Sequence, residues 1–475
     1  MTSDTGKRRL AVRIFTADDQ RAFAAWSGDC NPMHVDAVAA RRLLSGRQVV
    51  HGIHTLLWAL DVWAGIDTIE RRAVRCEFAH PVSVGDEVVL EQGQAADGSL
   101  ALMASVDGLV CTEITMPAAP LGLASLDASA EARPLGALTA PLDEAPEAQA
   151  GARYAAGHAA PAAAFPRISA RIGNAQVGAI MALSYCVGML CPGLHSVFSS
   201  LRLDLIGPAA DATTTFAVQR YDRRFGLFTI AFDGAVRGDL RAFRRPPPQP
   251  QPPSAEIAPL VAADEFASVH AVVLGGSRGL GETTAKILAA GGAHVTISYA
   301  AGADDAARVA ADVNAAGRGR CDACRIDLKD DDGYEALRPH AATLAEVYYF
   351  ATPRIYRKKA TLFDRRGFDE LADFYVDGLH RLCAWLEEAV GERRVTVFVP
   401  STVFIDDRPR GMTEYAMAKA ASEILAADLN RALKHVRIEV QRLPRLATDQ
   451  TASIVQVSTG STLDVLLAMV RSLPR

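Results

Sequence analysis

A run of prolines interrupts the chain at Arg245, where the sequence reads RPPPQPQPPSAE. Proline fixes φ and has no backbone N–H, so this run predicts a stiff polyproline spacer and not a helix or a central strand. A second break, at residues 118–164, is rich in alanine and proline and has little aromatic content. The sequence therefore predicts three folded blocks, residues 1–117, 165–244 and 264–475, joined by a connector at 118–164 and a linker at 245–263.

The composition is that of an ordinary globular protein. Of the 475 residues, 49% are hydrophobic and 22% are charged, and the net charge is −5. No long basic run occurs, so neither nucleic acid nor an anionic membrane is a predicted partner. The first residues contain no apolar signal core, and no segment reaches the roughly 18 apolar residues of a membrane span. We therefore expect a cytoplasmic protein whose ligand is a small molecule or an acyl carrier.

The eight cysteines do not suggest a disulfide framework in a chain of this length. Cys321 and Cys324 form a Cys-x-x-Cys pair, which in another context is redox-active or half of a zinc site. No second pair or histidine cluster follows them in the sequence. We interpret the pair as chance spacing near a strand and predict no metal site.

The segment AWSGDCNPMHVDAVAA places Asp29 and His34 five residues apart around Asn31 and Pro32 on an otherwise apolar stretch. A loop that carries charge only for solubility does not need such apolar neighbours. A carboxylate and an imidazole can share the proton transfers of general acid–base catalysis. The alternative interpretation is structural, with Asp29 as a helix cap and His34 as a buried neutral histidine.

The same segment resembles the hydratase motif of the MaoC-like, (R)-specific enoyl-CoA hydratases, and VVHG and FAHPVSVGDEV resemble later parts of their hot dog fold. The resemblance implies that Asp29 and His34 act on one water molecule during reversible addition of water to an α,β-unsaturated thioester. It also implies that the N–H of Gly52, at the start of a buried helix, polarises the thioester carbonyl. Asn31 is expected to orient the loop or the water. The motif residues are Gly28, Asp29, Asn31, Pro32, His34 and Ala40.

The middle block repeats this pattern in weaker form. GNAQVGAIMALSYCVGML predicts a buried helix, and SVFSSLRLDLIG, TTTFAVQRYD and LFTIAFDGAV predict the strands that follow it. The block lacks the Asp-x-Asn-Pro-x-His motif, and its His195 is interpreted as structural. We expect a second, degenerate hot dog unit that packs against the first and shapes an acyl tunnel without catalysing.

The third block alternates strand and helix patterns, which predicts a parallel α/β sheet. In VVLGGSRGLGE, Gly275, Gly279 and Gly281 follow a strand and open a helix, which would let a pyrophosphate approach the helix N-terminus. Further on, Tyr415 and Lys419 lie one helical turn apart. This block resembles the short-chain dehydrogenase/reductase family over residues 264–475.

The second resemblance implies that Tyr415 exchanges the proton of the substrate oxygen, that Lys419 lowers the pKa of this tyrosine and binds the nicotinamide ribose, and that Ser401 or Thr402 holds the carbonyl. NADP(H) is the predicted cofactor, because the second strand ends without the acidic residue that would repel a 2′-phosphate. Arg278 is expected to pair with that phosphate. The predicted cofactor-binding residues are Gly275, Ser277, Arg278, Gly279, Leu280, Gly281, Tyr299, Asp327, Ala351, Lys419 and Thr448.

Three departures from this family are visible in the sequence. FATP, residues 350–353, stands where the family has Asn-Ala-Gly. Tyr375 replaces its helix-borne catalytic asparagine, and Arg445 replaces the usual glycine of a later turn. The proton relay is therefore expected to differ, and the reductase activity to be slow or narrow.

Together these patterns predict an α+β double hot dog followed by an α/β Rossmann-type doubly wound parallel sheet. The predicted function is a bifunctional 3-oxoacyl-thioester reductase and (R)-3-hydroxyacyl-thioester dehydratase of polyketide or fatty-acid-type biosynthesis. The substrate is expected to be carried by CoA or by an acyl carrier protein, and a homo-oligomer is possible. Two alternatives are open, a catabolic hydratase/dehydrogenase and a dehydratase with a catalytically weak, cofactor-binding reductase scaffold.

Overall fold

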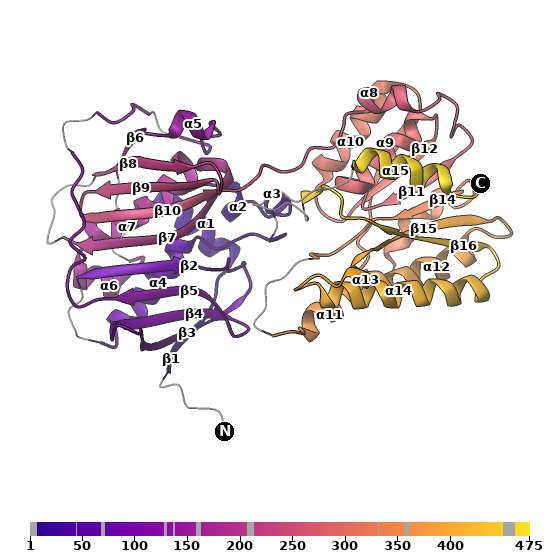
Figure 1. Cartoon of the computed structure of the whole chain (residues 1–475). Helices are drawn as coiled ribbons and strands as arrows, with labels where there is room; N and C mark the ends of the chain where they lie inside the picture. The colour runs from indigo at the N-terminus through magenta and orange to yellow at the C-terminus, as the bar shows by residue number, and fades with distance from the viewer. Residues whose placement is uncertain are drawn as a thin grey trace. The chain divides into compact units, whose positions relative to one another are not determined.

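The computed structural model describes residues 7–43, 45–67, 72–127, 131–135, 138–157, 163–206, 213–330, 332–355, 361–449 and 461–475. These residues form two compact units, one running to Pro247 and the other beginning at Pro248 (Figure 1). Within the described ranges, no single helix combines the length and apolar composition that a membrane crossing requires. The helices Pro166–Ile172 and Asn174–Leu190 have this length and composition only when they are taken together, and the two are bent by 116° relative to each other.

A ten-stranded sheet forms the first unit, and its strands pair antiparallel. Its order is β1-β3-β4-β5-β2-β7-β10-β9-β8-β6. The last five strands therefore repeat the arrangement of the first five in mirror order, and the two sets join where β2 pairs with β7. The strands are β1 (Arg8–Ile14), β2 (Ala73–Phe78), β3 (Glu87–Gln94), β4 (Leu100–Val106), β5 (Leu109–Met116), β6 (Arg153–Gly157), β7 (Ser196–Leu205), β8 (Thr213–Asp222), β9 (Leu227–Asp233) and β10 (Val236–Arg244).

Two buried helices, α4 (Gly52–Ala64) and α7 (Asn174–Tyr185), lie on the same side of this sheet (Figure 1). Both are apolar on nearly every side, because they pack into one continuous core with the inward faces of the strands. α7 continues directly into a π-helical turn, Cys186–Leu190. The remaining helices are α1 (Ala17–Ser27), α2 (Pro32–Val35), α3 (Ala37–Ala40), α5 (Pro146–Gln149), α6 (Pro166–Ile172) and a 3-10 turn (Gly193–His195).

Part of the segment expected to be a connector, residues 118–164, is built into this sheet. β6 pairs with β8 along the sheet edge. In β6 the side chains of Tyr154 and Ala156 are buried, and Ala155 between them is exposed. The small alanines weaken the period-two signal that marks a strand, so the sequence did not show it. The connector is therefore shorter than expected.

The second unit has a six-stranded parallel sheet in the order β13-β12-β11-β14-β15-β16, which confirms the predicted parallel α/β architecture. Along β11, Ala271 and Val273 face one hydrophobic core, and Val272 and Leu274 face the other. Helices α9, α10 and α15 belong to the first core, and α12 and α14 to the second. The strands are β11 (His270–Leu274), β12 (His294–Tyr299), β13 (Arg320–Arg325), β14 (Glu346–Tyr349), β15 (Val395–Thr402) and β16 (Val436–Leu443). The helices and helical turns are α8 (Ser254–Ile257), Ala258–Leu260, α9 (Gly279–Ala290), α10 (Ala303–Ala316), Gly333–His340, α11 (Arg365–Ala372), Asp373–Asp377, α12 (Gly378–Ala389), α13 (Phe404–Asp407), α14 (Thr413–Ala432) and α15 (Thr462–Ser472).

The proline-rich segment, expected to be a spacer as far as residue 263, is mostly part of the second unit. The N–H of Arg245 still donates to the carbonyl of His195 in the first unit, at 2.8 Å. The N–H of Gln249 already donates to Asp449 Oδ1 in the second unit, at 3.0 Å. α8 follows, and Ile257 is fully buried in the core beside α9. The linker is shorter than expected because this apolar residue joins a core as soon as the prolines end.

Candidate active sites

A tight turn between α1 and α2 presents Asp29 to the interior of the first unit. α1 ends at Gly28, whose φ of 77° is left-handed and favours glycine. Asn31 then caps α2, because its Oδ1 accepts from the N–H of Met33 at 3.2 Å. The turn buries Asp29 to 1% exposure, which is far below the usual exposure of a carboxylate.

The carboxylate of Asp29 packs against the second set of strands and their helix. Ser184, on α7, donates its hydroxyl to Asp29 Oδ2 at 2.6 Å. Gly188, in the π-helical turn, lies so close that a Cβ at this position would be 2.1 Å from Asp29 Oδ1. Neither residue was predicted from the sequence to belong to the site, because both lie in the block that lacks the motif. The sequence does contain an indication of the contact at Gly188, because a glycine inside an otherwise apolar helix often marks the close approach of another segment.

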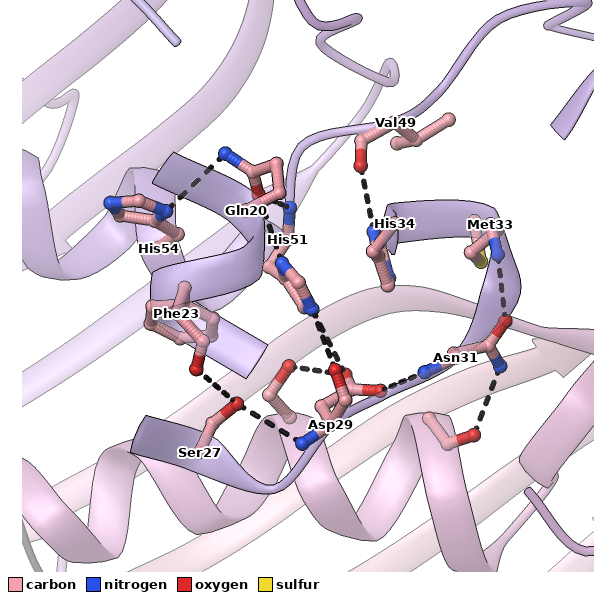
Figure 2. A network of polar contacts seen from close by, with 12 residues as sticks. Gln20, Phe23, Ser27, Asp29, Asn31, Met33, His34, Val49, His51 and His54 are labelled. Atoms are coloured by element: carbon pink, nitrogen blue, oxygen red, sulfur yellow. Dashed lines mark hydrogen bonds and ion pairs between the residues drawn. The ribbon is translucent and has the colours of Figure 1, made fainter. Parts of the chain in front are cut away.

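His34 lies on α2 with its ring oriented by the backbone of Val49. Its Nδ1 is 2.8 Å from the carbonyl oxygen of Val49 and must carry a hydrogen to bond it, which leaves Nε2 as a proton acceptor. The ring stacks on that of His51, with ring centres 3.9 Å apart and planes inclined by 22° (Figure 2). The structure thus brings the two predicted catalytic side chains of this unit together and adds His51 to them.

The side chain of Asn31, expected to orient the loop or the water, is bonded to backbone carbonyls that follow α7. Its Nδ2 donates to the carbonyls of Gly188 at 2.9 Å and of Gly193 at 3.2 Å. These contacts favour the role of holding the Asp29 loop against the second half of the unit.

Gly52 is the first residue of α4, as expected for the predicted oxyanion donor. The first N–H groups of a helix have no partner inside that helix and lie at its positive end. A Cβ at Gly52 would meet the ring of Phe78 at 3.0 Å. The position is therefore suited to glycine and presents a backbone donor.

Burial changes the pKa of both predicted catalytic groups of the first site. It raises the pKa of Asp29, although His34 and the hydrogen bond from Ser184 oppose this rise. It lowers the pKa of His34, although Asp29 opposes this fall. Both changes favour the uncharged forms, a carboxylic acid and a neutral imidazole, which are suited to act as an acid and a base, respectively.

Ligand atoms of Asp29, His34 and His51 lie within 4.8 Å of one another, a separation that would suit a metal ion. His51 does not offer a free lone pair in this arrangement. Its Nδ1 faces Gln20 Oε1 at 2.9 Å, and its Nε2 faces the carbonyl oxygen of Asp29 at 3.0 Å. We therefore assign no metal to this cluster.

The glycine loop of the second unit joins β11 to α9 in a close-fitting turn. Gly275 and Gly279 have left-handed φ values of 79° and 58°. A Cβ at Gly281 would lie 2.4 Å from the carbonyl oxygen of Gly275. The N–H of Gly275 donates to Ser298 Oγ at 3.0 Å. Because side chains are excluded, the loop forms a backbone cradle at the N-terminus of α9, next to buried Ser277 and half-buried Leu280.

Two other predicted cofactor residues lie beside this cradle. The backbone of Ala351 is 2.9 Å from where a Cβ of Gly275 would lie, and Thr448 Cγ2 is 3.9 Å from the corresponding point on Gly279. Asp327 accepts from the N–H of Lys329 at 3.1 Å and so shapes a turn after β13. Tyr299 is the last residue of β12.

Arg278, expected to pair with a 2′-phosphate, instead forms an ion pair with Asp449 at 3.4 Å. The same carboxylate accepts from Gln249 of the proline-rich segment. The contact with Asp449 was not predicted from the sequence, because Asp449 lies 171 positions after Arg278.

The two candidate hydroxyl residues of β15 have different surroundings. Ser401 Oγ donates to Glu423 Oε1 at 2.5 Å. Thr402 Oγ1 accepts from the N–H of Phe404 at 3.2 Å. Burial raises the pKa of Tyr415 to about 12, and the side chain of Thr402 opposes this rise. Neighbouring residues of a strand face opposite sides, so only one of the two can serve the site. Thr402 is the one of the two hydroxyl residues whose side chain acts on the pKa of Tyr415, whereas Ser401 is bonded to Glu423.

Lys419 is buried one helical turn after Tyr415, on α14. Its Nζ donates to the carbonyl of Pro400 at 2.6 Å and lies 3.8 Å from the ring centre of Tyr375. Burial lowers the pKa of Lys419 to about 7. Tyr375, expected from the sequence to stand in place of a catalytic asparagine, bonds through its hydroxyl to Thr352. At this position an aromatic ring therefore covers the lysine.

Comparison with protein families finds two matches. Residues 4–101 match the MaoC like domain, and residues 269–459 match the short chain dehydrogenase family. No curated protein matches the chain.

Similar solved structures include the RhlG/NADP active-site complex of Pseudomonas aeruginosa, which is 24% identical with a TM-score of 0.35, over 38% of this chain and 75% of that chain. Another is the alternative dihydrofolate reductase 1 of Brucella canis complexed with NADP, at 19% identity and a TM-score of 0.33, over 37% of this chain and 73% of that chain. A third is an alcohol dehydrogenase of the archaeon Thermococcus sibiricus complexed with 5-hydroxy-NADP, at 17% identity and a TM-score of 0.38, over 43% and 91%. By its two family matches, the chain is a fusion of a MaoC-like domain with a short-chain dehydrogenase domain.

Proposed function

We propose that the protein reduces a 3-oxoacyl thioester and then dehydrates the (R)-3-hydroxyacyl product to an enoyl thioester, in polyketide or fatty-acid-type biosynthesis. The observation that carries the proposal is the buried Asp29–His34 pair beside His51, the N-cap residue of α4, on the same chain as a glycine cradle and the Tyr415–Lys419 helix. The product of one reaction is the substrate of the other. The substrate is an acyl thioester of CoA or of an acyl carrier protein.

In the proposed dehydration, His34 Nε2 removes the proton from C2 while the carboxyl of Asp29 protonates the hydroxyl that leaves C3 as water. The N–H of Gly52 donates to the thioester oxygen, on which negative charge develops. The raised pKa of Asp29 and the lowered pKa of His34 support this division into acid and base. The reverse sequence of proton transfers hydrates an enoyl thioester.

We interpret the ten-stranded sheet with its two buried helices as a double hot dog. The mirror order of its strands supports this interpretation, with one helix for each set of five. The second half has no catalytic motif, but Ser184 and Gly188 place it in contact with Asp29. Its proposed role is to complete the wall of the dehydratase site and to shape the acyl tunnel.

The second unit is proposed to bind a nicotinamide dinucleotide. The cradle around Gly275 and Gly281, where a Cβ would collide with backbone, fits a pyrophosphate at the N-terminus of α9. When bound, the nicotinamide would supply the hydride for the ketone. Thr402 would hold the substrate oxygen, and Tyr415 would give it a proton.

A catalytically weak reductase is a second candidate, favoured by the surroundings of Lys419. Its Nζ is bonded to the carbonyl of Pro400 and covered by the ring of Tyr375. Burial keeps the pKa of Tyr415 high, at about 12. In this case the second unit binds the cofactor but reduces the ketone slowly.

The proposed function is tested by incubating the protein with NADPH and a 3-oxoacyl-CoA, and separately with the carrier-protein form, and following the products by mass spectrometry. We expect an (R)-3-hydroxyacyl intermediate and then an enoyl product. Reduction without dehydration, or neither, would contradict the proposal. Dehydration of added 3-hydroxyacyl thioester without any reduction would support the weak reductase.

NADPH is expected to be preferred over NADH by about tenfold in kcat/KM, since a charge-assisted contact from Arg278 to the 2′-phosphate is worth roughly 1.5 kcal/mol or more. The preference is limited because Asp449 competes for the guanidinium. Arg278→Ala should lower it, and Asp449→Asn should raise it. Steady-state kinetics with both cofactors measure the effect, and equal or better use of NADH by the wild type would refute the prediction and favour the catabolic direction.

A further inference from the structure

His51 is a fully buried histidine in the dehydratase site that the chemistry above does not use. It precedes Gly52 directly and occupies the N-cap position of α4. Its ring lies between those of His34 and Phe23, at centre distances of 3.9 and 4.8 Å. Figure 2 shows this ring between Gln20 and Asp29.

Both ring nitrogens of His51 face oxygen atoms that can only accept hydrogen bonds. Gln20 Oε1 lies 2.9 Å from Nδ1 and also accepts from the backbone N–H of His51, at 3.0 Å. The second contact fixes which end of the Gln20 amide is the oxygen. The carbonyl oxygen of Asp29 lies 3.0 Å from Nε2. A neutral imidazole carries one hydrogen, so either neutral form would leave a lone pair against a buried oxygen.

We propose that His51 is a positioning residue that carries, as an imidazolium, the proton that Asp29 delivers to the leaving hydroxyl. The proposal rests on the proposed dehydration. Burial alone favours an uncharged Asp29, but an ionised Asp29 beside a neutral His34 and a protonated His51 holds the same number of protons as an Asp29 acid beside two neutral histidines. We assign the ionised arrangement to the resting state. The proton of the general acid is then stored next to the carboxylate that uses it.

The distances allow this transfer with a small movement. His51 Nε2 lies 3.9 Å from Asp29 Oδ2, so a shift of about 1 Å would bring the two atoms into hydrogen-bonding distance. During dehydration the C2 proton passes to His34 Nε2. The C3–O bond breaks, its electron pair stays on the hydroxyl oxygen, and this oxygen takes the proton that has moved from His51 through Asp29. The product water can return a proton from His34 to His51, which restores the resting state.

Three titratable groups face His51, and their charges are compatible with the proposal. Asp29 is the counter-ion. His34 stays neutral beside a cation, which preserves its Nε2 as a base. His54, one turn further along α4, has its pKa lowered to about 3 by burial and is neutral. Burial and His34 also lower the pKa of His51, and the hydrogen bond to Asp29 opposes this; the two facing oxygens are the reason to assign the charged form.

The direct test is the nitrogen-15 NMR spectrum of the histidine side chains in the full-length protein at pH 7. We expect both ring nitrogens of His51 to show the shifts of protonated nitrogens, and His54 to show one protonated and one unprotonated nitrogen as an internal control. An unprotonated nitrogen in His51 would overturn the proposal. This measurement does not depend on activity. A protein without dehydratase activity would refute the proposed function, and the spectrum alone would then decide whether His51 is protonated.

Two variants at Gln20 provide a kinetic test. Gln20→Met keeps the length of the side chain but removes the oxygen that faces Nδ1, and we expect dehydration to fall about tenfold or more with a changed pH profile. Gln20→Glu keeps the acceptor and adds a negative charge, and we expect the spectrum of a protonated His51 to persist to higher pH. Unchanged pH profiles and spectra in both variants would contradict the proposal. The proposal would also be contradicted if the protein bound zinc at one equivalent per chain and lost dehydration when the zinc was removed, because a metal-bound nitrogen cannot carry the proton.

Discussion

Asp29→Asn is expected to lower the rate of dehydration of a 3-hydroxyacyl thioester by about a hundred- to ten-thousandfold, the usual contribution of a positioned acid or base. Asparagine keeps the size of the side chain and can still bond to Ser184, but it has no acidic proton to give to the leaving hydroxyl. Mass spectrometry with NADPH and a 3-oxoacyl thioester should then show the 3-hydroxyacyl intermediate accumulating, because the reductase residues belong to the other unit.

His34→Ala should have an effect of similar size, since it removes the group proposed to take the C2 proton. His195→Gln is the matched control, because His195 is also a buried histidine of the first unit but lies outside the cluster of Asp29, His34 and His51. We expect this control to dehydrate at close to the wild-type rate. Enoyl formation at the wild-type rate in Asp29→Asn or His34→Ala would remove the assignment of these residues.

Tyr415→Phe is expected to abolish measurable ketone reduction while NADPH still binds. The substitution deletes only the hydroxyl proposed to protonate the substrate oxygen, and the glycine cradle is untouched. Fluorescence titration of NADPH and a stopped or continuous assay of its oxidation separate binding from turnover. Reduction at the wild-type rate would mean that another acid serves, and the hydroxyl pair of Tyr375 and Thr352 would be the first place to look.

The same site predicts how reduction depends on pH. In the proposed reduction Lys419 acts as an ammonium that lowers the pKa of Tyr415, and burial lowers the pKa of Lys419 itself to about 7. The kcat/KM for reduction, which reports the free enzyme, should therefore be full below about pH 7 and fall as the pH rises and the lysine loses its proton. Lys419→Arg, which keeps its charge at high pH, should remove this fall even if its rate is lower.

Short-range patterns in the sequence predicted which candidate site residues of one stretch of chain lie together. Asp29 and His34 are close in sequence and lie together in the structure, as do Tyr415 and Lys419 on α14. The contacts of Ser184 and Asp449 could not be predicted in this way, because they depend on how distant segments pack.

The choice between two adjacent hydroxyls shows the same limit. Ser401 and Thr402 differ by one position, and a shift of one residue along a strand moves a side chain to the opposite face. The register of β15 against its neighbours decides which face meets Tyr415, and no local pattern carries that information. β6 was missed for a related reason, since Ala155 and Ala156 differ in burial but not in residue type.

The proline-rich segment is anchored at Arg245 in the first unit and at Gln249 in the second, which leaves Pro246, Pro247 and Pro248 between the anchors. In a polyproline conformation three residues span on the order of 10 Å. A tether this short fixes the local concentration of one unit around the other whatever the dilution of the protein, so under the proposed function an intermediate released by one unit would meet a high effective concentration of the other. The yield of enoyl product per ketone reduced should then be insensitive to how much protein is present.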